Sequence, residues 1–193
     1  MSVPALTPSQ TVGPFFAPAL LRPDAPGNVL VRAETAGERI RIEGHLYDGE
    51  RAPVPDALIE IWQANSEGRY RHPADGRAGP LDPAFSGFGR CGTDSEGRFW
   101  FETVRPGPVP FAGGRLQAPH TCVTVHARGL LNHLVTRLYF ADEPANAADA
   151  VLACVSASRR TTLLAARDPG AGIAVYRWAI ILQGEGETAF LNV

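Results

Sequence analysis

The sequence predicts an all-β domain, a β-sandwich or barrel with little helix. Six short segments have the alternating, β-branched or aromatic composition of strands. Twenty glycines and 17 prolines among 193 residues indicate many turns, without reaching the share that marks low-complexity chains. Short strands joined by such turns favour an antiparallel sandwich or barrel.

The length suits one domain with an additional arm. At roughly 150 residues per domain, the 193 residues exceed one domain and fall short of two. A hydrophobic share of 45% and a charged share of 20% exclude a disordered chain, and a domain of this size needs no disulfides to fold. We expect an N-terminal arm over residues 1–32 and the β-sandwich over residues 33–193.

The arm is rich in proline, which weakens the hydrogen bonding of both helices and sheets. Its prolines are Pro4, Pro8, Pro14, Pro18, Pro23 and Pro26. It also carries apolar side chains that are unusual in a free tail, namely Val12, Phe15, Phe16, Leu20 and Leu21. We therefore expect the arm to lie on another surface, either that of its own domain or that of a partner chain.

The predicted strands follow the arm in order. Residues 39–43 alternate between charged and apolar side chains, as a half-buried strand does, and Asp48-Gly49 marks a turn after them. The other segments with strand composition are residues 57–62, 98–104, 121–127, 134–140 and 175–182. Residues 69–90 are predicted to form a long loop, a feature that is usually functional or disordered. The one fair helix candidate is the stretch 147–166, whose apolar spacing is irregular.

Charge and apolar patterning exclude several classes of protein. The net charge is −2 and the pI is about 6.2, so nothing favours binding to nucleic acid or to an anionic membrane. The apolar runs are far shorter than the ~18 residues needed to span a bilayer. The first ten residues lack the basic and apolar pattern of a secretion signal. Three cysteines without C-x-x-C spacing argue against a disulfide framework, so we expect a reducing, cytoplasmic location.

Several residue types that bind metals lie on or near one predicted strand. His120 and Cys122 are two residues apart, so their side chains leave the same face of the strand. His126 continues that face about 13 Å farther on, at ~3.3 Å per residue, too far to share an ion with Cys122 in a straight strand. Tyr70 in the long loop can add a phenolate, and His72 follows it. Two interpretations stay open: a metal site, which needs at least a third ligand, or a buried histidine and cysteine in the core.

Arg128 is the candidate for binding an anionic ligand. It lies at the end of a predicted strand and precedes Gly129, where a guanidinium can face a cleft. The planar fork of donors in arginine suits the carboxylate of an acidic small molecule. The alternative is a salt bridge at the surface or at an interface, a role shared by many exposed arginines. The sequence has no G-x-S-x-G, G-x-G-x-x-G or P-loop motif.

Seven short motifs resemble those of the intradiol ring-cleaving dioxygenases. In chain order they are TPSQTVGPF (7–15), EIWQA (60–64), FGR (88–90), APH (118–120), ARG (127–129), TRLYF (136–140) and QGEGET (183–188). They extend from residue 7 almost to the C-terminus, so the resemblance covers nearly the whole chain. It implies a β-sandwich of the intradiol-dioxygenase type with a proline-rich N-terminal arm.

The resemblance further implies an enzyme of two homologous β-sandwich chains, in which the β chain holds a ferric ion on two tyrosines and two histidines. Here Tyr70 matches the first tyrosine and His120 the first histidine. Val109 stands at the second tyrosine, Cys122 at the second histidine, and Gln117 replaces a basic residue. Because valine has no donor atom and a thiolate is a soft ligand, the match implies that the four iron positions are vestigial. The expected metal is therefore Fe(III) held by the β subunit, with none in this chain.

The implied function is a share in the O2-dependent intradiol cleavage of 3,4-dihydroxybenzoate, a small aromatic acid, to 3-carboxy-cis,cis-muconate. The resemblance places Arg128 in the wall that binds the substrate, and Thr11, Gly13 and Pro14 of the arm near the bound ring. The arm is then expected to pack on the partner β chain. Two alternatives remain. One is a catalytically silent scaffold or aromatic-acid-binding subunit, and the other is a stand-alone metalloenzyme that uses Tyr70, His120 and Cys122.

Overall fold

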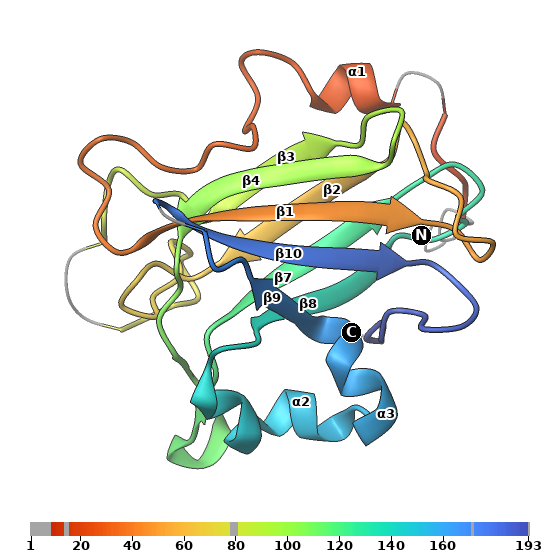
Figure 1. Cartoon of the computed structure of the whole chain (residues 1–193). Coiled ribbons are helices and arrows are strands. Elements are labelled where there is room, and N and C mark those ends of the chain that lie inside the picture. Colours follow the sequence, from red (N-terminus) through yellow and green to blue (C-terminus); the bar gives the residue numbers. More distant parts are fainter. Residues whose placement is uncertain (1–8, 14–15, 78–80, 171, 193) are drawn as a thin grey trace, which may run out of the picture.

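In the computed structural model, eight strands form one continuous hydrogen-bonded sheet, which folds over into two layers (Figure 1). The structure describes residues 9–13, 16–77, 81–170 and 172–192. The order is β3-β2-β7-β8-β9-β10-β1-β4. The strands are β1 (Arg39–Tyr47), β2 (Leu58–Gln63), β3 (Phe88–Gly92), β4 (Arg98–Val104), β7 (His120–His126), β8 (Leu134–Phe140), β9 (Leu164–Arg167) and β10 (Ala174–Ile181). The prediction of an all-β sandwich with little helix is confirmed.

The short strand β9 connects the two layers, since it pairs with β8 on one side and with β10 on the other. The strand pairs β8–β9 and β1–β10 are parallel, whereas the remaining pairs are antiparallel, so the sheet is mixed rather than purely antiparallel as predicted. Parallel neighbours require a long crossover connection. Residues 141–163 provide it between β8 and β9, and they contain most of the helical turns among the described residues.

The buried side chains of the two layers form the main core. Strand β1 alternates as its sequence predicts, with Ile40, Ile42 and Leu46 buried. Gly44 interrupts this apolar series because a Cβ atom there would lie 2.2 Å from the Phe99 ring of the neighbouring strand. Glycine therefore allows an aromatic ring to lie directly on the strand.

The segment that leads into the sandwich pairs along the edge strand β4. The amide of Leu30 donates to the carbonyl of Glu102 (2.9 Å), and the amide of Glu102 donates to the carbonyl of Asn28 (2.8 Å). Leu30 and Val31 are buried in the main core. Residues 28–31 therefore contribute to the packing of the sandwich.

The helices are short. They are α1 (Phe16–Leu20), α2 (Ala150–Cys154) and α3 (Ala157–Arg160), with 3-10 turns η1 (Ala112–Gly114), η2 (Pro144–Ala148) and η3 (Thr161–Leu163). None of the helices in the described residues is long and apolar enough to cross a membrane. Two further strands, β5 (Val109–Pro110) and β6 (Leu116–Gln117), form a separate small hairpin.

The predicted helix over residues 147–166 is wrong. Asp149 and Val155 have extended backbone conformations that separate η2, α2 and α3. The last residues of the stretch belong to β9, because pairing with two strands outweighs the helical preference of an alanine-rich segment. Helix α1 lies in the proline-rich arm, where Pro18 falls in the first turn and displaces no helical hydrogen bond.

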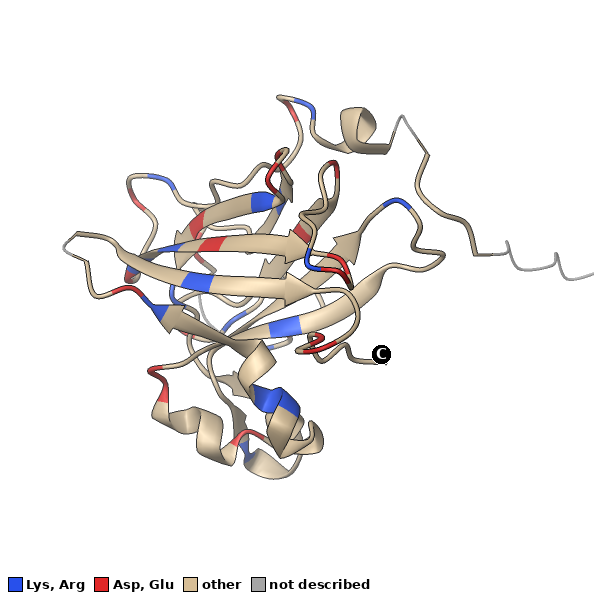
Figure 2. Ribbon diagram, turned by 45° about the vertical axis from the view of Figure 1, so that its right-hand side comes forward, with Lys and Arg blue, Asp and Glu red and all other residues tan. Residues whose placement is uncertain are grey.

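Charged residues of both signs are interspersed on the strands and loops (Figure 2). This distribution matches the small net charge of −2. A protein with such a surface lacks the single-sign field that attracts polyanions.

Candidate functional site

The outer face of the layer β3-β2-β7-β8 carries the candidate residues at its two ends. In the strand register, Cys122 lies between Trp62 of β2 and Arg137 of β8, so the three share one face. His120 and His126 lie on the same face, as predicted, at the first and last positions of β7. At ~3.3 Å per residue they are separated by about 20 Å.

The end of this face at His120 has a network of neutral groups. The Nδ1 atom of His120 lies 2.7 Å from the carbonyl oxygen of Ala118, and because a carbonyl only accepts, Nδ1 carries the proton. The Nε2 atom then faces the Tyr70 hydroxyl at 3.5 Å. Burial lowers the pKa of His120 to about 4, helped by the nearby Arg137 charge, and burial raises the pKa of Tyr70 to about 12. Both side chains are uncharged at neutral pH.

Arg137 brings a positive charge to this network. Its Nη1 atom donates to Oε1 of Gln117 at 2.7 Å and to the hydroxyl of Tyr139 at 3.3 Å. Burial raises the pKa of the Cys122 thiol, against the opposing effect of the adjacent Arg137 guanidinium. The cysteine is therefore a neutral thiol at neutral pH. We call Tyr70, Gln117, His120, Cys122, Arg137, Tyr139 and Asp149 the Arg137 cluster.

Asp149 ties the Arg137 cluster to the helices below the sheet. It is 1% exposed and accepts a hydrogen bond from the Tyr139 hydroxyl (3.1 Å). It also accepts from the backbone amides of Ala118 (2.8 Å) and of two residues in the first turn of α2. Asp149 is not among the residues predicted for the site, although an aspartate directly before Ala-Val-Leu is a typical helix N-cap.

Val109 lies beside the cluster and lines a hollow with Tyr70 rather than completing a set of donors. It is buried in the short strand β5, opposite Gln117. The hollow has a volume of about 420 Å³, and its aromatic wall includes Trp62 and His72. The rings of Trp62 and Tyr70 stack there with centroids 5.7 Å apart.

The four positions that match the iron ligands of the resembling family do not fit a ferric ion. Fe(III) is a hard acid, favoured by anionic oxygen donors and imidazole. Tyr70 and His120 offer such donors, but Val109 offers none and Cys122 offers a soft sulfur. Arg137 adds a cation beside them. Within the part of the chain that the structure describes, no three histidine, cysteine, aspartate or glutamate side chains converge as a metal site.

The other end of the face, at His126, contacts the N-terminal arm. A hollow of about 350 Å³, which we call the arm pocket, lies between the arm and the loop after β7. It is lined by Gln10, Thr11, Val12, Gly13, Phe16, His126, Ala127, Leu130, Leu131, Asn132 and His133. The Thr11 hydroxyl accepts a hydrogen bond from the Gly129 amide at 2.9 Å, and the Ser9 hydroxyl donates to the Asn132 side chain at 2.8 Å. The structure therefore brings the predicted residues Thr11 and Gly13 to this loop.

Arg128 is not among the residues that line the arm pocket. Its side chain is 70% exposed, and its ion pair with the exposed Asp56 has a long N–O distance of 3.9 Å. Such a pair contributes little to stability. The guanidinium is therefore available to another partner. Pro14, the remaining predicted site residue, lies outside the described residues.

His126 is partly buried between charged and aromatic neighbours. Its ring lies 5.2 Å from that of Phe16 and 5.5 Å from that of His133, measured between centroids. Its Nε2 atom is 3.7 Å from Glu60, which in turn pairs with Arg90 at 2.5 Å. Burial lowers the pKa of His126, so the ring is neutral at neutral pH. Residues 120–126 form one strand with consecutive pairing, so at ~3.3 Å per residue His126 lies about 13 Å along β7 from Cys122.

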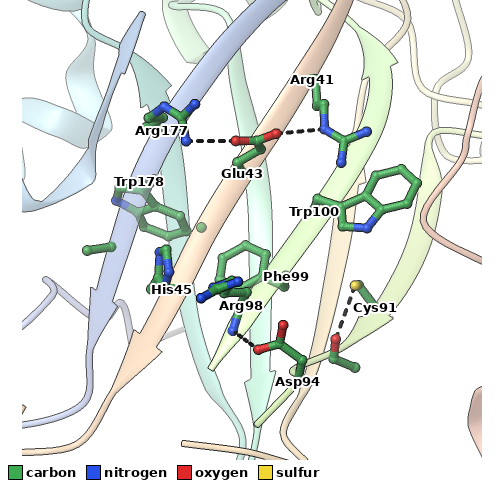
Figure 3. Close-up of a pocket in the computed structure, with 13 residues that line it drawn as sticks. Arg41, Glu43, His45, Cys91, Asp94, Arg98, Phe99, Trp100, Arg177 and Trp178 are labelled. Carbon is green, nitrogen blue, oxygen red and sulfur yellow. Dashed lines mark hydrogen bonds and ion pairs between the residues drawn. The ribbon is translucent and has the colours of Figure 1, made fainter. Parts of the chain in front are cut away.

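A further hollow lies elsewhere, over β1, β4 and β10 (Figure 3). Its volume is about 770 Å³. Glu43 pairs there with both Arg41 and Arg177 at 2.8 Å, and the Arg41 guanidinium lies 4.0 Å from the centre of the Trp100 ring. Internal ion pairs thus occupy much of this surface, and none of the predicted site residues lines it.

Comparisons with known proteins agree with the motifs and the fold. The sequence model of a family described as "Dioxygenase" matches residues 12–184. The chain is 43% identical to the alpha chain of protocatechuate 3,4-dioxygenase from Burkholderia cepacia, over 97% of each chain. It is also 34% identical to the beta chain of that enzyme from the same organism, over 86% of this chain and 73% of the beta chain.

A solved structure gives the same result. The dioxygenase domain of a dioxygenase and carbohydrate-binding protein fusion from Streptomyces sp. SirexAA-E has a TM-score of 0.64 to this chain at 26% identity. The similarity covers 95% of this chain and 99% of that one. These matches confirm what the seven motifs predict: the chain belongs to the intradiol ring-cleavage dioxygenase family.

Proposed function

We propose that this chain is the alpha subunit, the one without iron, of a protocatechuate 3,4-dioxygenase. The observation that carries the proposal is the combination of a nearly full-length match to an alpha chain with a donor set that does not suit Fe(III). Val109 and Cys122 stand at two of the four positions that match the iron ligands. The assembled enzyme would use O2 to cleave 3,4-dihydroxybenzoate between its two hydroxylated carbons and form 3-carboxy-cis,cis-muconate.

The metal chemistry is assigned to a homologous partner. The family uses non-haem iron, and this chain is similar to a beta chain as well as to alpha chains. This relationship supports an assembly in which Fe(III) is held by the beta chain alone. The activation of the catechol toward O2, which iron supplies when bound, then takes place in that chain.

The contribution of this chain is to help bind and orient the substrate across the contact between the subunits. Arg128 is exposed and only loosely paired, so its guanidinium is free to donate two parallel hydrogen bonds to a carboxylate. Thr11 anchors the arm to Gly129, the residue next to Arg128. Gly13 and Pro14 continue the same arm and are proposed to approach the ring. Holding two reactants in a fixed orientation lowers the entropic part of the barrier.

The direct test is reconstitution. The full chain is produced alone and together with the beta chain, and ring cleavage of 3,4-dihydroxybenzoate is followed by O2 consumption. We expect no turnover from this chain alone and turnover from the pair. Ring cleavage by this chain alone, at a rate comparable with that of the pair, would show that it holds a complete active site.

The alternative function is that of a silent scaffold, and the position of Arg128 favours it in one respect. The side chain does not line the arm pocket, so its approach to a substrate depends on how the partner docks. In a scaffold, replacing Arg128 by alanine leaves kcat and KM of the assembled enzyme unchanged. In a substrate-binding subunit the same change raises KM.

A further inference from the structure

Two motifs of the sequence, EIWQA and FGR, meet beside the arm pocket through their charged residues. Glu60 of β2 and Arg90 of β3 lie directly opposite each other in the strand register, and their side chains form an ion pair of 2.5 Å. The second carboxylate oxygen of Glu60 lies 3.7 Å from Nε2 of His126. The three side chains are between 19% and 23% exposed, so water reaches them only in part. We call Glu60, Arg90 and His126 the Glu60 triad.

The Glu60 triad supports the N-terminal arm. The ring of His126 lies 5.2 Å, between centroids, from that of Phe16, the first residue of α1. The amide of Phe16 donates to the carbonyl of Gly13 at 3.1 Å, so this contact leads directly to a residue proposed to approach the substrate ring. The amide of Arg90 donates to the carbonyl of Gly27 at 3.0 Å. The triad therefore contacts the arm at α1 and again beyond it.

The same triad lies at the start of the loop that carries Arg128. His126 is the last residue of β7 and precedes Arg128 by two positions in the chain. The amide of Gly129, the residue after Arg128, donates to the Thr11 hydroxyl of the arm at 2.9 Å. Both groups proposed to reach the substrate, the arm and the Arg128 guanidinium, therefore depend on where the His126 ring lies.

We propose that Glu60 is a positioning residue for substrate binding in the assembled enzyme, because it holds His126 and thereby the loop of Arg128. The ion pair with Arg90 gives the carboxylate a fixed direction. Its negative charge favours the neutral histidine tautomer with the proton on Nε2, and with it one orientation of the ring. Displacing a group that holds the substrate by ~1 Å can lower the rate by ~100-fold. The proposal rests on the proposed function, which assigns Arg128 to the substrate carboxylate.

The first test is the steady-state kinetics of the complex with the beta chain, with 3,4-dihydroxybenzoate as substrate. We expect Glu60→Ala to raise KM about tenfold and to leave kcat within about twofold, since the loss falls on substrate binding. Glu60→Gln keeps an acceptor for Arg90 and should raise KM only about threefold. Glu43→Ala is the matched control and should leave KM unchanged, because this carboxylate bridges Arg41 and Arg177 on the other layer of the sandwich.

A double variant separates positioning from other effects of the substitution. If Glu60 acts through Arg128, adding Glu60→Ala to Arg128→Ala raises KM no further. A full tenfold increase in that background overturns the proposal. An unchanged KM in Glu60→Ala, while Arg128→Ala raises KM, overturns it and leaves the proposed function intact. If Arg128→Ala itself leaves KM unchanged, the substrate-binding role of this chain fails, and the positioning role of Glu60 fails with it.

The second test uses this chain alone and measures hydrogen exchange of the Gly129 amide, which reports on the contact with Thr11. We expect about threefold faster exchange in Glu60→Ala, a local loosening. The amide of Asp168, which donates to the Val175 carbonyl between β9 and β10, should keep the wild-type rate. Circular dichroism and urea unfolding check that the variant is folded. Equal acceleration of both amides, or an unchanged Gly129 amide, would overturn the positioning role.

Discussion

The two ends of the outer face of β7 differ in how their polar groups are satisfied. At the His120 end, the Arg137 cluster is closed by hydrogen bonds among its own members and to the backbone of Ala118. At the His126 end, the arm pocket is open and Arg128 stays largely in solvent. The same strand thus carries a self-contained network at one end and an incomplete site at the other. This contrast is expected of a chain that has lost its own metal site and contributes residues to a site shared with a partner.

The largest expected effect is on the closed end. Asp149→Ala removes four hydrogen bonds from a carboxylate that is 1% exposed and leaves several buried donors unpaired. We expect a loss of about 4 kcal/mol in the free energy of unfolding, measured in urea. Asp24→Ala is the matched control, because Asp24 is exposed and paired only with Arg22. If both changes cost the same, the Arg137 cluster contributes no special stability.

The second effect is the pH dependence of the free energy of unfolding that His120 causes. The pKa of His120 is about 4 in the folded chain and near 6.5 when unfolded, so the unfolded state binds the proton more tightly. The folded state therefore gains stability from a neutral His120. This gain is complete above about pH 6.5 and is lost as the pH falls toward 4. The difference corresponds to about 3 kcal/mol. His120→Gln should abolish the pH-dependent contribution of His120 to stability. The difference in unfolding free energy between the wild type and this variant should therefore shrink from pH 7 to pH 4. A difference that stays constant would contradict the lowered pKa of His120.

The third effect concerns the open end and is seen in activity. In the assembled enzyme we expect Arg128→Ala to lower kcat/KM by roughly 30-fold, about 2 kcal/mol, through a higher KM, because a charge-assisted hydrogen bond to the substrate carboxylate is lost. Arg128→Lys should lose less, since it keeps the charge but not the planar fork. Asp56→Asn is the control, because it removes the weak ion pair of Arg128 and keeps a residue type that tolerates the left-handed backbone (φ 58°) at this position. Kinetics unchanged by Arg128→Ala would reduce the chain to a scaffold.

The smallest effect is on the arm. Thr11→Val removes the oxygen that accepts from the Gly129 amide, a loss of about 1 kcal/mol. We expect roughly fivefold faster hydrogen exchange of that amide, whereas Thr11→Ser, which keeps the oxygen, should stay near the wild type. Equal exchange in Thr11→Val and the wild type would mean that the arm is held by its apolar contacts alone.

Much of the fold follows from local patterns in the sequence. Each of the six predicted segments overlaps an observed strand, because period-two alternation and β-branched residues suit a half-buried sheet. Strand β3 was not predicted. It lies at the end of the predicted loop, and Gly89 and Gly92 weaken its strand-like composition. Strand β9 was hidden in an alanine-rich stretch that has helical preference, and only its pairing with two neighbours makes it a strand.

The candidate site was less accessible to sequence reasoning. The common face of His120 and Cys122 follows from their spacing, and the loss of a donor at Val109 follows from the resemblance, which sets this valine at the position of the second tyrosine. The role of Arg137 does not, because it depends on the β7–β8 register that places residue 137 opposite residue 122. Register is fixed by the turn and by the packing of the whole sheet. The contact of Thr11 with Gly129 joins residues 118 positions apart and has no local signal either.

The most direct test of the account is the iron content of the purified complex of this chain with the beta chain, measured by atomic spectrometry against protein concentration. We predict one iron per pair of chains, and an iron content that is unaffected when His120 of this chain is replaced by glutamine. Two irons per pair, or loss of iron in the His120→Gln complex, would contradict it, because this chain would then hold a metal of its own.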